Sequence, residues 1–92
     1  MANAPIGFTL IMRIEMPNTA GAFGLLASAI GDAGGIVGAV DMRSVTKQFV
    51  VRDVTVTVPN DQVGDAVREA ILKIEGVRLV SSSDSWPFSN RP

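Results

Sequence analysis

The chain has 92 residues, of which 47% are hydrophobic, and a formal net charge of -1. This length supports one compact domain with one modest core. The charge argues against nucleic acid as the main partner, because neutralising phosphates takes a surplus of Lys and Arg. Cysteine, histidine and tyrosine are absent, which removes the commonest metal ligands and the commonest general base. We therefore expect no metal, no cofactor and no catalytic residues.

No stretch reaches the roughly 20 apolar residues that span a bilayer. Arg13 and Glu15 interrupt the apolar run near the N-terminus, which lacks the charged start of a secretion signal. We expect a cytoplasmic protein without a membrane partner.

The first predicted element is a strand over residues 8–16. Its apolar residues alternate with polar ones and share one face: Phe8, Leu10, Met12, Ile14 and Met16. A period of two is typical of a strand, and Pro17 ends it because proline cannot donate to the ladder. Residues 1–7 are predicted to be a disordered lead-in.

A turn and a helix follow this strand. Apolar residues recur at helical spacing and predict one buried face: Phe23, Leu26, Ala27 and Ile30. We expect Asn18 or Thr19 to cap the first turn with a side-chain oxygen. Gly34 and Gly35 are expected to end the helix.

Two further strands are predicted over 36–45 and 50–58, joined by a hairpin at 46–48. Gly38 indicates a bulge or a close backbone approach in the first of them. In the second, valines at 54, 56 and 58 alternate with polar residues. Met12, Met16 and Met42 are expected to fill the core, the last of them from the first of these strands.

A second helix opens at residues 59–61 and ends at Gly76. Its apolar stripe is Val63, Val67, Ala70, Ile71 and Ile74. A short strand over 77–82 follows. Residues 85–92, with Trp86 and Phe88, are predicted to be a tail or linker.

These elements predict an α+β fold, a ferredoxin-like βαββαβ sandwich. The sheet has four antiparallel strands in the order 4-1-3-2, with both helices on one face. The domain is expected to span residues 8–84. This architecture hosts unrelated functions, so the fold alone identifies none of them.

Two other functions on this fold are less favoured. An RNA-binding domain stacks bases on aromatic residues of the exposed sheet face, and here the outward positions of the third strand include Asp53. A small acyl-phosphate hydrolase needs an arginine in the loop after the first strand, and residues 17–21 contain none.

The segment 14–26 resembles the signature of the ACT family of regulatory domains, which is a strand, a short polar turn, a glycine and a helix with an aliphatic stripe. The family often has proline before this glycine, where this chain has Ala20. Segments 32–37, 51–56 and 74–78 continue the resemblance, which covers about residues 8–84.

Segments 52–56 and 76–80, with Asp84, look like the ACT segment found ahead of the catalytic region of some bacterial malic enzymes (malate oxidoreductases). On that resemblance we expect this chain to be the regulatory piece only.

The candidate ligand site is the turn before the first helix, made of Asn18, Thr19, Ala20, Gly21 and Ala22. A helix N-terminus presents unpaired N–H groups and a positive potential, which favour a carboxylate. Gly21 lets a ligand approach the backbone, and Asn18 offers both a donor and an acceptor. The alternative is that Asn18 and Thr19 only cap the helix.

The second strand, 36–45, is expected at a sheet edge, where pairing with a second copy would cover it. The resemblance suggests that an amino acid or small carboxylate binds at this homodimer seam. The turn of one subunit would face Gly35, Ile36 and Val37 of the other, so that binding couples to dimer geometry and gives allosteric regulation. The alternative is a dimerisation module without a small ligand.

Overall fold

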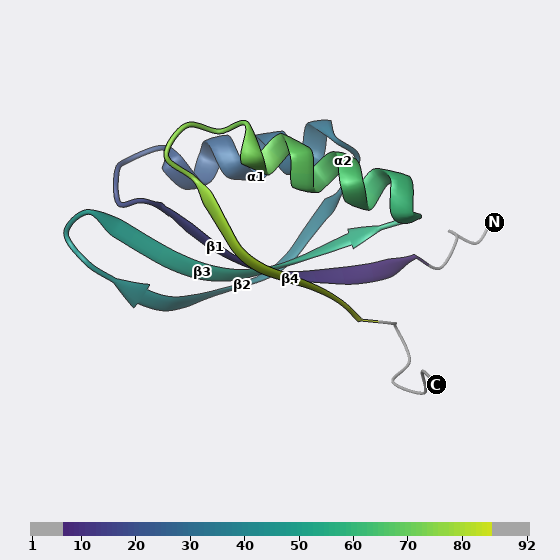
Figure 1. Ribbon diagram of the computed structural model, residues 1–92, viewed down its shortest axis with the longest axis horizontal. Coiled ribbons are helices and arrows are strands. Elements are labelled where there is room, and N and C mark those ends of the chain that lie inside the picture. The colour runs from purple at the N-terminus through teal and green to yellow at the C-terminus, as the bar shows by residue number, and fades with distance from the viewer. Residues whose placement is uncertain (1–6, 86–92) are drawn as a thin grey trace.

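A computed structural model describes residues 7–85. Its elements in chain order are β1 (Phe8–Pro17), α1 (Ala22–Asp32), β2 (Ile36–Val45), β3 (Phe49–Val58), α2 (Asp61–Leu72) and β4 (Arg78–Ser85). The four strands form one antiparallel sheet in the order β2-β3-β1-β4. Both helices cover the same face of this sheet (Figure 1). The predicted α+β architecture is confirmed, and 4-1-3-2 is the same order counted from the other edge, which is compatible with a ferredoxin-like fold.

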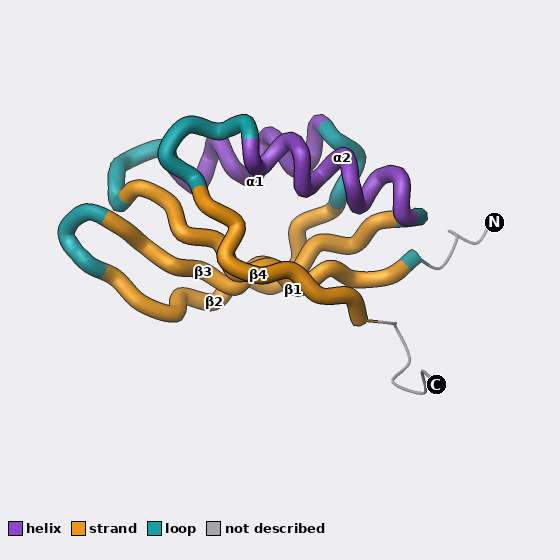
Figure 2. The backbone as a smooth tube through the Cα atoms, in the orientation of Figure 1, coloured by secondary structure: helices purple, strands orange, loops and turns teal. Residues whose placement is uncertain are grey.

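The molecule has two layers, a twisted sheet and a pair of helices, and the other face of the sheet is uncovered (Figure 2). The core lies between the layers. Apolar side chains from both layers are fully buried there, namely Leu10, Met12 and Ile14 of β1, Val54, Val56 and Val58 of β3, Leu26 and Ile30 of α1, and Val67 and Ile71 of α2. The period of two in the strands and the helical stripes therefore identified the buried faces correctly.

Met42 does not belong to this core, and its prediction as core filler is wrong. Its side chain is 54% exposed because β2 is an edge strand, with β3 on one side only. Gly38 behaves as predicted. The register between β2 and β3 shifts around it, and a Cβ there would lie 2.7 Å from the Thr55 hydroxyl.

The end of α1 and the start of α2 agree with the sequence-based predictions, and the end of α2 is an exception. Gly34 has a positive φ of 105° after α1, the conformation that glycine adopts at little cost. Asn60 caps α2, because its Oδ1 accepts a hydrogen bond from the Val63 N–H at 2.8 Å. The exception is Gly76. The helix ends at Leu72, and Gly76 lies in the turn before β4.

Both ends of the domain extend beyond their predicted limits. β4 continues to Ser85, into the segment predicted as tail, because pairing with β1 orders its polar residues. Gly7, predicted in the lead-in, is buried, and a Cβ there would clash with the Val58 carbonyl oxygen. Residues 1–6 and the rest of the tail, with Trp86 and Phe88, lie outside the described residues.

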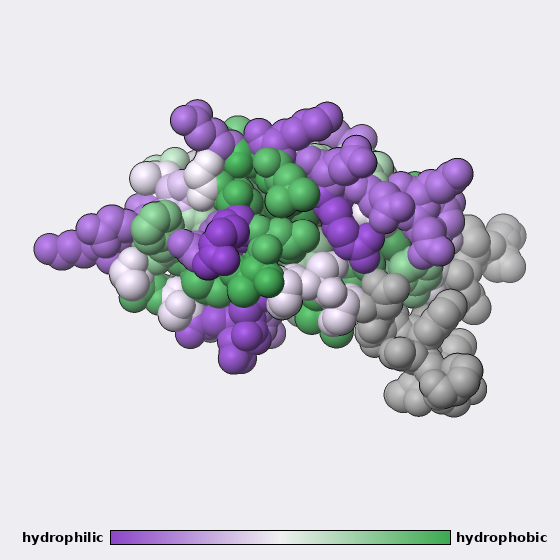
Figure 3. Space-filling view, viewed as in Figure 1, coloured by the Kyte–Doolittle hydropathy of each residue, from purple (hydrophilic) through white to green (hydrophobic). Residues whose placement is uncertain are grey.

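The surface seen in Figure 3 gathers apolar residues near its middle, around β4, and surrounds them with polar ones. Within the described part of the chain, no helix is long and apolar enough to cross a membrane.

Candidate functional site

The turn between β1 and α1 is anchored to the β2–β3 hairpin by Asn18. The Asn18 side-chain amide donates a hydrogen bond to the Thr46 carbonyl oxygen at 2.8 Å. Its backbone N–H donates to the Gln48 carbonyl oxygen at 2.9 Å. Asn18 therefore fixes the turn against the end of the edge strand β2, a contact between residues far apart in the sequence that periodicity could not indicate.

The prediction that Asn18 or Thr19 caps α1 is wrong. The N-cap residue is Gly21, with a φ of 85°, and no side chain makes a capping hydrogen bond. Instead, the Thr19 carbonyl oxygen accepts a hydrogen bond from the Ala22 N–H at 3.2 Å. The first turn of α1 also contains no acidic residue. The positive end of this helix is therefore not neutralised by its own side chains.

A cavity of about 120 Å³ lies beside this turn. Pro17, Thr19, Ala20 and Ala22 line one side of it, and Ile74 and Val77 of the turn before β4 line another. Three of the five predicted turn residues thus share one small, largely apolar cavity. Asn18 and Gly21 are not part of its lining, and Asn18 makes its contacts on the β2 side of the turn.

The other predicted residues lie at the opposite end of α1. Gly35 follows the helix, and Ile36 and Val37 begin β2. Ile36 is 69% exposed at the sheet edge, whereas Val37 packs against the core. Since α1 has 11 residues and is therefore roughly 16 Å long, one copy of the chain does not bring the two halves of the predicted site together.

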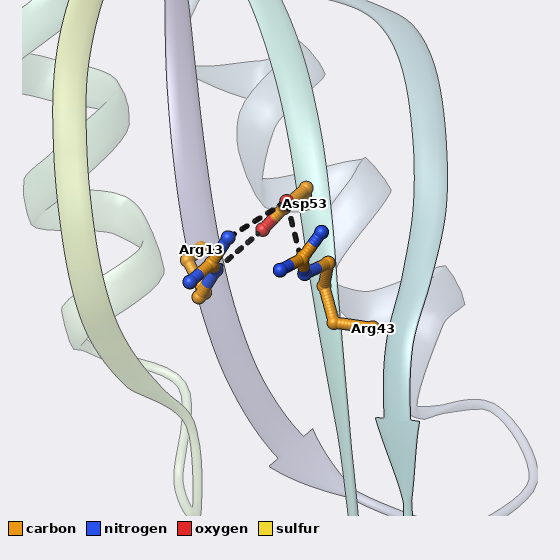
Figure 4. Close-up of polar contacts among 3 residues, drawn as sticks. All are labelled: Arg13, Arg43 and Asp53. Atoms are coloured by element: carbon orange, nitrogen blue, oxygen red, sulfur yellow. Dashed lines mark hydrogen bonds and ion pairs between the residues drawn. The ribbon is translucent and has the colours of Figure 1, made fainter.

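The uncovered face of the sheet carries a cluster of charges centred on Asp53 (Figure 4). Arg13 of β1 binds Asp53 of β3 through two hydrogen bonds, Nε to Oδ1 at 2.8 Å and Nη2 to Oδ2 at 3.2 Å. Arg43 of β2 approaches the same carboxylate at 3.5 Å. The hydrogen bond from Arg13, and then the charges of both arginines, hold the pKa of Asp53 below its usual value and raise the pKa of Arg13.

This cluster ties three neighbouring strands together and predicts a pH-dependent stability. A carboxyl group with a lowered pKa in the folded state stabilises it at a pH above its unfolded value of about 3.9, and the contribution is lost as the pH falls through the folded value. Asp53→Asn should therefore melt below the wild type at pH 7, and the gap should narrow as the pH falls below the unfolded value of about 3.9. Thermal unfolding followed by circular dichroism measures the melting temperatures at each pH.

Asp65→Asn, which removes an exposed carboxylate paired with Arg68 on α2, is the control. Its melting temperature should differ less from that of the wild type. A gap between Asp53→Asn and the wild type that did not narrow at any acidic pH would contradict this role of Asp53.

Within residues 7–85, no group of three or more potential ligand side chains could hold a metal ion.

Comparison with known proteins links this chain to malic enzymes. No family model matches the sequence. The chain is 36% identical over 75 residues to the NAD-dependent malic enzyme of Geobacillus stearothermophilus. The matched region covers 82% of this chain and 16% of that protein. It is also 36% identical over 74 residues to NAD-dependent malic enzyme 1 of Bacillus subtilis (strain 168), covering 79% of this chain and 17% of the relative. The chain thus matches a small part of the length of both relatives.

Proposed function

We propose that this chain is a non-catalytic regulatory module of the ACT type, linked to a malate oxidoreductase, which binds an amino acid or small carboxylate between two copies of itself. The observation that carries the proposal is the match to malic enzymes over 16% of a relative's length. A dinucleotide-binding fold is built on parallel strands. The region that matches folds into an antiparallel sheet, so it supplies something other than the NAD site.

The sheet edge formed by β2 supports the pairing of two copies. Three of its apolar side chains are about half or more exposed: Ile36 at 69%, Met42 at 54% and Val45 at 52%. An exposed edge strand offers unpaired N–H and C=O groups to a second strand. A two-fold axis through the middle of β2 would make the two strands antiparallel and the sheet continuous.

The same symmetry would bring the two half-sites together. In antiparallel pairing, the start of one β2 lies beside the end of the other. The end of β2 leads into Thr46, whose carbonyl oxygen holds Asn18. Residues 35–37 of one copy would therefore face the Asn18 turn of the other. A ligand bound there contacts both subunits, so its affinity and the dimer geometry are coupled.

The test of ligand binding is calorimetry and thermal shift on the whole chain with the amino acids and the C4 dicarboxylates. Asn18→Ala should weaken the ligand by about 1 kcal/mol or more, because it removes a polar partner and releases the turn from Thr46. Asn60→Ala is the matched control, since it removes an exposed asparagine that caps α2 and should lower stability without changing affinity. A melting temperature that no ligand shifts, or equal effects of the two variants on affinity, would contradict ligand binding at this turn.

The second candidate, a dimerisation module that binds no small ligand, rests on the exposed apolar edge alone. Sedimentation of the apo chain tests the pairing common to both candidates. Met42→Lys should shift the chain toward the monomer, because it places a charge on the β2 edge. Val80→Lys puts the same charge on β4, at the other edge, and should leave the dimer intact. A wild-type monomer at high concentration would refute both candidates.

A further inference from the structure

One arginine in the described part of the chain has no carboxylate partner. Arg13 and Arg43 contact Asp53, Arg68 contacts Asp65, and Arg78 contacts Glu15. Arg52 makes no such ion pair with any residue in 7–85. Because a charged group that is partly removed from water normally acquires a partner, this difference calls for an explanation.

Arg52 lies on the helix-covered face of β3, which is the inner strand paired with the edge strand β2. Its register partners are Ile14 of β1, which is buried, and Met42 of β2. The guanidinium carbon lies 5.3 Å from the centre of the Phe23 ring. Its Nε atom is buried and has no hydrogen-bond partner, while the side chain as a whole is partly exposed. An approaching ligand would therefore meet the outer Nη atoms.

Phe23 places this cation at the N-terminal end of α1. It is the second residue of the helix and follows Gly21 by two positions. The first turn of α1 contains no acidic residue, so the positive helix end and the Arg52 guanidinium are adjacent with no negative side chain of that turn between them. Both features favour an anion.

We infer that Arg52 binds a carboxylate of the regulatory ligand and selects a small dicarboxylate. One carboxylate is held by the N–H groups of residues 19–21 in the turn, since the Asn18 N–H already donates to Gln48, and the other accepts hydrogen bonds from the Nη atoms of Arg52. Arginine suits this role because its planar fork matches a carboxylate, and the Phe23 ring fixes its orientation. This inference rests on the proposed function, since it names the class of ligand for the same site.

The experiment measures affinities of the whole chain for matched ligands by calorimetry. Aspartate and succinate, with two carboxylates, are compared with asparagine and acetate, with one. The wild type should bind the dicarboxylates at least about tenfold more tightly, the size expected of hydrogen bonds to a charged group. Arg52→Gln should remove this preference and leave the affinity for the monocarboxylates unchanged. Arg43→Gln removes an equal charge from the neighbouring strand on the opposite face and should leave the preference intact.

The outcomes separate this inference from the proposed function. If asparagine or another neutral amino acid binds as tightly as aspartate, or if Arg52→Gln keeps the preference, the inference is wrong while the regulatory site stands. If neither these ligands nor any other amino acid or C4 dicarboxylate binds, the proposed function itself fails. Should Arg52→Gln not fold, Arg52→Lys keeps the charge and the aliphatic stem, and it should still weaken the dicarboxylates several-fold because the fork is lost. An unchanged affinity in that variant would overturn the inference.

Discussion

Gly35→Val should lower the free energy of unfolding by about 1–3 kcal/mol, because the added side chain has no room. A Cβ at this position would lie 2.6 Å from Val56 Cγ1 and 3.0 Å from methyl carbons of Ile30 and Val67. All three neighbours are fully buried. They belong to a densely packed core, in which the strain can be relieved only by moving several side chains together. Chemical denaturation followed by circular dichroism measures the loss.

Gly31→Ala is the matched control for this change. Gly31 lies in α1, and a Cβ there has no atom within 4 Å. Alanine at this position should raise stability by about 0.5–1 kcal/mol, because it reduces the freedom of the unfolded chain. If Gly35→Val were as stable as the wild type, the start of β2 would be less closely packed than the structure shows. The sequence suggested Gly35 as a helix stop and a ligand contact, and the structure adds a packing role.

Local patterns were sufficient to predict most of the fold. The alternation in β1 and β3 and the stripe of α1 each depend on residues that are close in sequence, and the buried faces follow from them directly. β4 was harder to delimit, because residues 81–85 are mostly serine and carry no apolar alternation. Their strand conformation comes from pairing with β1, which no local pattern contains.

The candidate site was predicted less completely, because its contacts join distant segments. Asn18 resembles a capping residue in sequence, yet its side chain binds Thr46. A cap would use the Oδ1 atom of Asn18 as an acceptor, whereas the hairpin contact uses its Nδ2 as a donor, and the sequence alone does not show which of the two is made. Arg52 gave no signal as a site residue, since its position beside Phe23 depends on how α1 crosses the sheet. The exposure of Met42 likewise follows from the strand order and not from its own residue type.

Leu26→Ala should lower the free energy of unfolding by about 2–5 kcal/mol, more than Gly35→Val does, because it leaves a cavity in the core. Leu26 is fully buried and is one of two such residues that attach α1 to the sheet, the other being Ile30. The neighbouring Leu25 is 64% exposed. Leu25→Ala should therefore change stability by no more than about 0.5 kcal/mol.

This pair of variants also distinguishes the contribution of α1 to ligand binding from the contribution of the cavity beside the turn. Leu25 lines that cavity, and Leu26 does not. Denaturant titrations of both variants give the stabilities, and calorimetry with the best ligand found for the wild type gives the affinities. We expect Leu26→Ala to destabilise α1 as a whole, so any loss of affinity in this variant should be accompanied by a loss of stability.

A change in affinity for Leu25→Ala at unchanged stability would place the ligand in the apolar cavity on the β4 side of the turn. Unchanged affinity would favour the β2 side, where Asn18 contacts the hairpin. Equal destabilisation by the two variants would contradict the burial of the α1 stripe.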